Sequence, residues 1–145
     1  LNLAPMNELS PELLKCIDII TPNETEAERL TGLKIRNIES AKKAAKAIYN
    51  MGVKKVVLTM GHLGAVICES GKSTAVAAPT VEAIDTTAAG DVFNGALAVA
   101  LSDGKGLENA VEFACKAASI SVTRLGAQSS IPHRSELIAG TRIKD

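Results

Sequence analysis

Hydrophobic positions along the chain change repeatedly between the spacing of helices and that of strands. Between residues 38 and 51, small or apolar residues recur every three or four positions, which predicts an amphipathic helix closed by Gly52. The β-branched run at 55–59 is typical of a buried parallel strand. A second helical period covers residues 107–122. The pattern therefore predicts helices interspersed with strands.

Shorter segments continue this alternation. Ser10, Pro11 and Glu12 are typical of a helix start and predict a helix to about residue 15, followed by a buried strand at 16–20. A turn at 21–26 then leads into a helix that we expect to end at Gly32. The other expected elements are strands at 65–69 and 73–77 joined by a hairpin turn at 70–71, a strongly apolar helix at 92–101, a polar loop at 126–132 and a short helix near 136. This order indicates an α/β fold with a mostly parallel sheet.

Length and composition set wider limits. The 145 residues match the size of one domain, at about 150 residues each. Acidic and basic residues number 16 each, so no net positive charge attracts nucleic acid. Aromatic residues make up only 2%, which leaves no set of rings on which nucleic-acid bases could stack. No apolar run is long enough to span a membrane, for which about 18 residues are needed. Nucleic acid and membrane are therefore not expected partners.

The cysteines and histidines are few and widely separated. Cys16, Cys68 and Cys115 form no C-x-x-C pair, and their odd number argues against a disulfide scaffold. A reducing, cytoplasmic compartment is the expectation. His62 and His133 are too few and too distant to form a metal cluster.

One apparent phosphate motif is rejected. Gly71, Lys72, Ser73 and Thr74 resemble the end of a P-loop, but that motif requires a glycine where Val66 stands. The segment also falls in the expected hairpin, whereas a P-loop joins a strand to a helix.

The strongest cluster of candidate functional residues lies at 85–95, with the sequence DTTAAGDVFNG. Small residues before an apolar helix leave backbone N–H groups accessible at its N-terminus, where the helix dipole also attracts anions. Asp91 beside such a site is suited to accept a proton from an attacking hydroxyl. Alternatively, Asp91 merely complements the helix dipole.

The pattern D-T-x-x-A-G-D-x-F resembles the signature of the ribokinase-like carbohydrate kinases. The resemblance implies a Rossmann-like, three-layer α/β/α fold. It also implies that Asp91 contacts the sugar and is the catalytic base, and that the amides of Ala88, Ala89 and Gly90 form the anion hole. Ala88 stands where most members have glycine, but it retains the N–H.

Two earlier motifs are similar to nucleotide-binding motifs of that family. In the N-x-x-E motif, Asn23 would meet ATP phosphate and Glu26 would hold Mg²⁺ through water, although this spacing also predicts a helix capping box. The T-x-G-x-x-G pattern at 59–64 would approach the ATP phosphates, although an ordinary turn explains it too. The residues implied at ATP are Asn23, Thr59, Met60, Gly61, His62, Leu63, Gly64, Gly90, Asp91 and Cys115. For Cys115, which would lie near adenine, a small buried hydrophobic residue is the alternative.

The loop RLGAQSSIP at 124–132 resembles a family loop that holds a monovalent cation, usually K⁺, beside the anion hole. Oxygen dipoles can replace the hydration shell of such an ion. An ordinary Ser/Gly-rich surface turn is the alternative. The implied ligands are Asp85, Thr87, Ser121, Arg124, Gly126 and Ser130, the middle four through backbone oxygens.

The resemblance also implies a function and a boundary. The loop at 124–132 is closest to that of members that transfer phosphate from ATP to D-ribose; a kinase of another sugar or nucleoside, or a nucleotide-binding module without turnover, are alternatives. Residues 2–5 resemble a family N-P-A-P loop, with Leu3 replacing a proline, so the resemblance begins midway through the fold. We therefore expect residues 1–145 to be the C-terminal nucleotide-binding and catalytic part of one domain, without the sugar motif, lid or dimer contacts. The whole protein would be a homodimer, and the isolated chain inactive.

Overall fold

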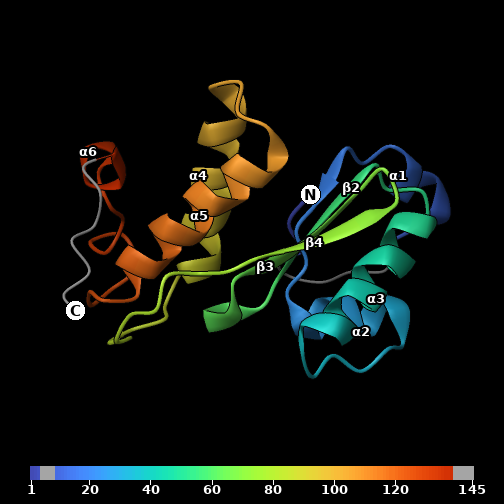
Figure 1. The fold of residues 1–145 in the computed structure, drawn as a ribbon, viewed down its shortest axis with the longest axis horizontal. Coiled ribbons are helices and arrows are strands. Elements are labelled where there is room, and N and C mark those ends of the chain that lie inside the picture. The colour runs from blue at the N-terminus through green and yellow to red at the C-terminus, as the bar shows by residue number, and fades with distance from the viewer. Residues whose placement is uncertain (4–8, 139–145) are drawn as a thin grey trace. The chain divides into compact units, whose positions relative to one another are not determined.

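The computed structural model describes residues 1–3 and 9–138, so the second half of the resemblance at 2–5 lies outside the described residues. The chain forms two compact units, unit 1 at Leu1–Ala77 and unit 2 at Ala78–Asp145 (Figure 1). Among the described residues, no helix is both long and apolar enough to cross a bilayer.

Unit 1 contains a four-stranded sheet in the order β1-β2-β3-β4. The strands are β1 (Ile19–Ile20), β2 (Lys55–Thr59), β3 (Ala65–Glu69) and β4 (Lys72–Val76). The first pair is parallel and the other two are antiparallel. The α/β class is confirmed, but the sheet of the described residues is mixed, and the expectation of a mostly parallel sheet is wrong there. The turns after β2 and β3 are too short for the crossover that parallel strands need.

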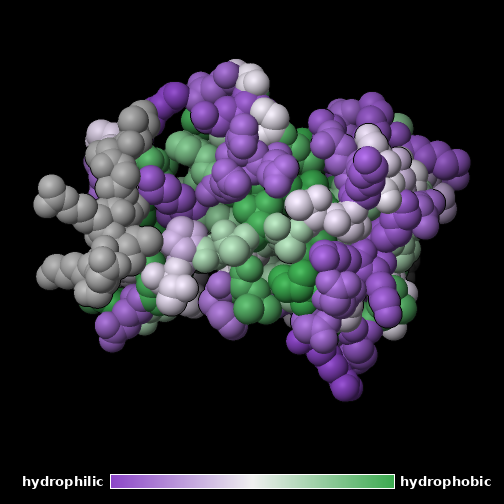
Figure 2. Space-filling view, in the orientation of Figure 1, coloured by the Kyte–Doolittle hydropathy of each residue, from purple (hydrophilic) through white to green (hydrophobic). Residues whose placement is uncertain are grey.

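The described residues of unit 1 also form the helices α1 (Pro11–Lys15), α2 (Glu24–Thr31) and α3 (Ile38–Asn50). Helix α3 packs on β2, β3 and β4 and contacts α2. Ala41, Ala44 and Ala45 on its inner face are fully buried, because small side chains let the helix approach the sheet closely. The visible outer surface of this helical layer is mainly hydrophilic (Figure 2).

The hydrophobic core of unit 1 lies between these helices and the sheet. Ile20, Ile48, Val56, Leu58 and Val66 are fully buried in one cluster. Burial of each such side chain contributes about 1.5–3 kcal/mol relative to exposure. Ile48, Val56 and Leu58 of this core lie in the two segments at 38–51 and 55–59 whose apolar patterns predicted a helix and a buried strand.

Unit 2 is helical, with α4 (Ala89–Ser102), α5 (Leu107–Ser121) and α6 (Arg134–Ile138). Helices α4 and α5 pack along each other (Figure 1). Helix α4 begins three residues before the expected position 92, because Ala89, Gly90 and Asp91 already adopt helical geometry. The expected helix near residue 136 is confirmed.

Two strand boundaries differ from the expectation, and the hairpin is confirmed. The Cys16 N–H donates to the Leu13 carbonyl and the Ile17 N–H donates to the Leu14 carbonyl, so these residues close α1 and the expected strand at 16–20 shrinks to β1. Strand β4 begins one residue early, at Lys72. Ser70 and Gly71 have φ angles of 50° and 76°, as two-residue hairpin turns require. The rejected P-loop segment is therefore a hairpin, as predicted.

Candidate active site

The N-terminus of α4 presents unpaired backbone amides. Its N-cap, Ala88, makes no side-chain capping bond. The Ala89 N–H donates to the Thr86 carbonyl at 3.2 Å, and the Val92 N–H donates to the Ala88 carbonyl at 2.9 Å. Within the described residues, the amides of Ala88, Gly90 and Asp91 have no acceptor. Such donors, aligned with the dipole, form an anion-binding site.

The conformation of Ala88 is unusual for a residue with a side chain. Its φ of 59° lies in the left-handed region, which costs a non-glycine residue about 1–2 kcal/mol. By contrast, a β-carbon added at Gly90 would meet no atom within 4 Å. Ala88 therefore supplies its N–H to the predicted anion hole, but its left-handed backbone conformation costs free energy that a glycine at this position would not. The three predicted amides are not equivalent, because that of Ala89 is already paired.

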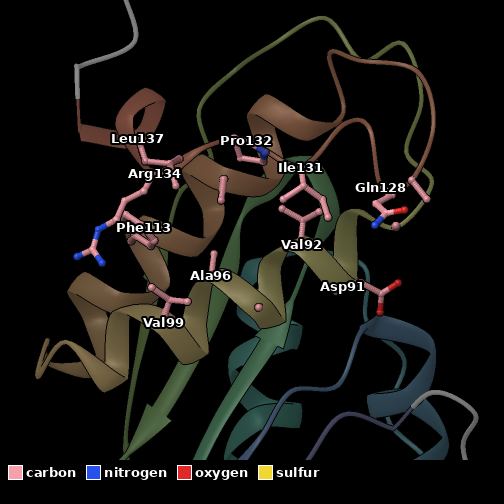
Figure 3. Close-up of a pocket in the computed structure, with 14 residues that line it drawn as sticks. Asp91, Val92, Ala96, Val99, Phe113, Gln128, Ile131, Pro132, Arg134 and Leu137 are labelled. Carbon is pink, nitrogen blue, oxygen red and sulfur yellow. The ribbon is translucent and has the colours of Figure 1, made fainter.

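Asp91 occupies the first turn of α4 and is exposed. Its side chain extends outward from the first turn of the helix (Figure 3). No donor among residues 1–3 and 9–138 binds this carboxylate, although an acidic residue at this position commonly accepts the N–H of the N-cap. The side chain is therefore available to a substrate hydroxyl. Attraction to the helix dipole acts at the same position, so the alternative role is compatible with this arrangement.

Asp85 connects the amide turn to the polar loop at 124–132. Its Oδ1 accepts the Thr87 N–H and its Oδ2 accepts the Gly126 N–H, each at 2.9 Å. Hydrogen bonds from the Thr87 side chain, and from the backbone of Gly126 and Thr87, lower the pKa of Asp85. Gly126 has a φ of 87°, and a β-carbon there would meet Ser129 Oγ at 2.7 Å. The loop geometry thus requires glycine at 126.

The residues predicted to bind a monovalent cation offer oxygen atoms. Ser121 and Ser130 are buried, and their hydroxyls donate to the carbonyls of Ala118 and Ala127, both at 2.8 Å. Since its proton is used internally, the Ser130 hydroxyl retains lone pairs for a cation, whereas Ser121 would bind through its backbone carbonyl. The described part of the chain has no group of three or more His, Cys, Asp or Glu suited to a metal ion. The donor set fits a cation held mainly by neutral oxygens, with Asp85 supplying charge.

In unit 1, Asn23 and Glu26 form the capping box of α2. Asn23 Oδ1 accepts the Glu26 N–H and Glu26 Oε2 accepts the Asn23 N–H, each at 2.9 Å. Glu26 is buried, whereas Asn23 is exposed. The capping interpretation is confirmed. One carboxylate oxygen of Glu26 remains outside this pair, and Mg²⁺ commonly uses one carboxylate together with phosphate oxygens.

The predicted turn at 59–64 lies beside that cap. Asn23 and Thr59 form a parallel bridge, and the Thr59 N–H donates to the Pro22 carbonyl at 2.9 Å. A 3₁₀ turn at Gly61–Leu63 follows, with positive φ at Gly61 and Gly64. Both segments follow the carboxyl ends of the parallel strands β1 and β2, where α/β proteins commonly bind ligands. The structure thus brings together the two groups of ATP residues predicted in unit 1.

Sequence comparison decides the family. Residues 2–134 match the sequence model of the pfkB family of carbohydrate kinases. The chain belongs to this family. A ribokinase of Haemophilus influenzae is 51% identical over 138 residues, which cover 95% of this chain and 45% of the relative. Thus the chain spans about half the length of its curated relatives.

Solved structures of pfkB relatives agree with the fold. A ribokinase of Thermotoga maritima is 45% identical, with a TM-score of 0.85 over 95% of this chain and 46% of that one. A ribokinase of Arabidopsis thaliana complexed with ribose and ATP is 37% identical, with a TM-score of 0.88 over 95% of this chain and 45% of that one. The predicted family and the predicted ribokinase-like fold are therefore confirmed.

Cys115 of this pfkB chain is a buried residue of α5, 3% exposed. Burial, together with the charge of Glu112, raises the pKa of its thiol to about 11. The thiol is therefore neutral near pH 7 and packs as a small hydrophobic group. Its proximity to adenine stays a prediction.

A pocket of about 380 Å³ in unit 2 was not expected from the sequence (Figure 3). Its apolar lining includes Val92, Ala96, Val99, Phe113, Ile131 and Leu137, and Asp91, Gln128 and Arg134 add polar groups. Val99 is 43% exposed and Ile131 is 52% exposed. The only sequence signal is that α4 is apolar on nearly all sides, a pattern typical of a fully enclosed helix.

Proposed function

We propose that this chain supplies the catalytic base and phosphate-binding turn of an ATP-dependent ribose kinase, which converts D-ribose and ATP to D-ribose 5-phosphate and ADP. The observation that carries this proposal is the open N-terminus of α4, where amides and the nearby Asp91 carboxylate have no partner among the described residues. Ribose as the acceptor is supported by the similarity to ribokinases, including the one complexed with ribose and ATP.

In this mechanism, Asp91 accepts the proton of the primary hydroxyl while the hydroxyl oxygen attacks the γ-phosphorus. A bond forms between that oxygen and phosphorus, and the bond from phosphorus to the bridging oxygen of ADP breaks. The amides of Ala88 and Gly90 donate to the transferring phosphoryl oxygens, whose charge they stabilise. The Ala89 amide contributes when its bond to Thr86 opens.

The remaining assignments from the resemblance belong to the same proposal. In unit 1, Asn23 and the turn at 59–64 contact ATP phosphates, and Glu26 holds Mg²⁺ through water. In unit 2, Asp85, Thr87, Ser121, Arg124, Gly126 and Ser130 hold K⁺, and Cys115 adjoins adenine. Mg²⁺ neutralises phosphate charge when bound. The whole protein would be a cytoplasmic homodimer, and the chain alone would not phosphorylate ribose.

A chimera tests the base. This chain would replace the matched 138 residues of the Haemophilus influenzae ribokinase, to which it is 51% identical. We expect ATP-dependent ribose phosphorylation by the chimera, and about a 10²–10⁴-fold lower kcat for Asp91→Asn, the range typical of general bases. Asn94→Ala, one turn along α4, is the control and should retain activity within a few-fold, since within the described part of the chain its side chain bonds only the Gly90 carbonyl.

The outcomes of this assay separate the alternatives. Unchanged turnover by the Asp91→Asn chimera contradicts the base role. To test the acceptor, the protein in its full natural length would be assayed with ribose, other sugars and nucleosides. Preference for another acceptor would assign a different kinase of the same family, and ATP binding without transfer would indicate a module without turnover.

A further inference from the structure

Glu136 of α6 contacts both ends of the loop at 124–132, namely Arg124, which is its first residue, and His133, which follows its last residue. Its Oε1 accepts a hydrogen bond from the Arg124 guanidinium, and its Oε2 accepts the His133 N–H at 2.7 Å. Arg124 begins the loop and His133 precedes α6. One carboxylate therefore joins the side chain of Arg124 to the backbone N–H of His133, nine residues further along the chain.

The loop that Glu136 closes is bonded in turn to the amide turn of α4. The Gly126 N–H of the loop donates to Asp85 Oδ2, while Asp85 Oδ1 accepts the Thr87 N–H. Thr87 directly precedes Ala88, the N-cap of α4. The contacts therefore run without a gap from α6 through the loop and Asp85 to the candidate phosphate site, all within unit 2.

Within the loop itself, hydrogen bonds from side chains to the backbone connect its two ends. The hydroxyls of Ser129 and Ser130 donate to the carbonyls of Leu125 and Ala127, at 2.9 and 2.8 Å. Ser130 is 1% exposed, so the middle of the loop is anchored inside the unit. Because the loop is bonded internally and at both ends, releasing its ends should affect the whole loop.

From these contacts we infer that Glu136 is a positioning residue for the amide turn of α4, acting through the closed loop and Asp85. It touches no reacting group. Its role in phosphoryl transfer rests on the proposed function, but the contact path itself does not.

A second ion pair supplies a matched control. Arg134, in the same short helix, pairs with Asp103 at the end of α4, and this contact does not include the loop at 124–132. Both pairs attach α6 to the rest of unit 2 and both are partly exposed. Asp103→Ala therefore loosens α6 without opening the loop, whereas Glu136→Ala does both.

Amide hydrogen exchange, followed by NMR on the 145-residue chain without nucleotide, tests the inference. We expect Glu136→Ala to accelerate exchange at Gly126 and Thr87 by about tenfold or more, because opening the loop breaks the Gly126 bond to Asp85 and so frees the Asp85 carboxylate that also holds the Thr87 N–H. Asp103→Ala should leave the exchange rates of the Gly126 and Thr87 amides within about twofold of those in the unsubstituted chain. Glu136→Gln, which can still accept the His133 N–H, should restore much of the protection, and it also serves if Glu136→Ala fails to fold.

The inference is overturned if the Glu136 variants change exchange only within 133–137, or if Asp103→Ala accelerates Gly126 and Thr87 equally. Its failure is distinguishable from that of the proposed function. An inactive chimera with the expected exchange pattern would contradict only the kinase assignment, while an active chimera with unchanged exchange would contradict only the role of Glu136.

Discussion

The N-termini of α2 and α4 differ in how their free backbone N–H groups are treated: α2 has a side-chain cap and α4 has none. At α2, the side chains of Asn23 and Glu26 each accept an N–H of the other residue. At α4, the N-cap is an alanine in the left-handed region, without any side-chain bond. Both helices begin beside residues that the family resemblance assigns to ATP, yet only α4 leaves its amides open.

This difference separates two uses of a helix start. A side-chain cap typically contributes about 1 kcal/mol to stability, so α2 gains stability where α4 gains none. At α4, the left-handed alanine adds a further cost. An uncapped start with local strain is typical of functional sites, where an outside anion replaces the cap. The comparison therefore favours α4 as the phosphoryl-transfer site and gives α2 a definite structural role.

The largest expected effect comes from removing one open amide of α4. Gly90→Pro deletes an N–H in the first helical turn, where proline is tolerated. We expect about a 10²–10³-fold lower kcat in the chimera, the typical cost of losing one oxyanion-hole donor. Gly90→Ala retains the amide, and the open space at this position accepts a methyl group, so it should stay near full activity. Equal activity of both variants in steady-state assays would refute the amide role.

The next effect concerns the closed cap of α2. Asn23→Ala should lower the free energy of unfolding by about 1 kcal/mol, measured by urea denaturation. Asn37→Ala is the matched control, because Asn37 forms the equivalent capping box of α3 with Ser40. If Asn23 also binds phosphate, only Asn23→Ala weakens binding of an ATP analogue in calorimetry. Equal affinities would limit Asn23 to capping.

A smaller, opposite effect is expected at Ala88. Ala88→Gly removes the cost of the left-handed conformation and retains the N–H, so the free energy of unfolding should rise by about 1 kcal/mol. Urea denaturation checks this, and turnover of the chimera should change little. Destabilisation by Ala88→Gly would show that the turn does not hold residue 88 at positive φ in solution.

The smallest effect is a pH dependence at Asp85. Its folded-state pKa is depressed by the hydrogen bonds from Thr87 and Gly126, so the contribution to stability is present above the ordinary value of 3.8 and is lost as pH falls through the lowered pKa. Asp85→Asn should therefore lower the Tm near neutral pH, and the difference from the unsubstituted chain should shrink below about pH 4. A Tm difference that persists unchanged into acid would contradict the ionised carboxylate.

Local signals made much of unit 1 predictable. Helix α3 has a regular apolar period and a glycine after it, and β2 is a β-branched run, so both were found nearly to the residue. The mixed sheet was missed because pairing direction depends on connection length, which a strand's own residues do not encode. Cys16 was placed in a strand because its apolar character conceals its use as a helix cap.

In unit 2, residue types revealed the candidate chemistry but not its geometry. Asp91 and the small residues before it could be found from the motif, yet the early start of α4 and the pairing of Ala89 could not, because small residues carry no periodic signal. The pocket beside α4 was missed because a helix that is apolar on nearly all sides indicates no preferred face. The contact of Arg124 with Glu136 depends on how the intervening loop folds.

The most direct test determines which helix N-terminus, that of α2 or that of α4, binds the phosphates of an ATP analogue. The ¹⁵N-labelled chain would be titrated with a non-hydrolysable ATP analogue and Mg²⁺, and backbone amide shifts followed by NMR. We predict that the largest shifts occur at Ala88, Gly90 and Asp91, whose amides are open. Binding of the analogue that leaves these three amides unshifted, while shifting those of Asn23 and Glu26, would contradict the account.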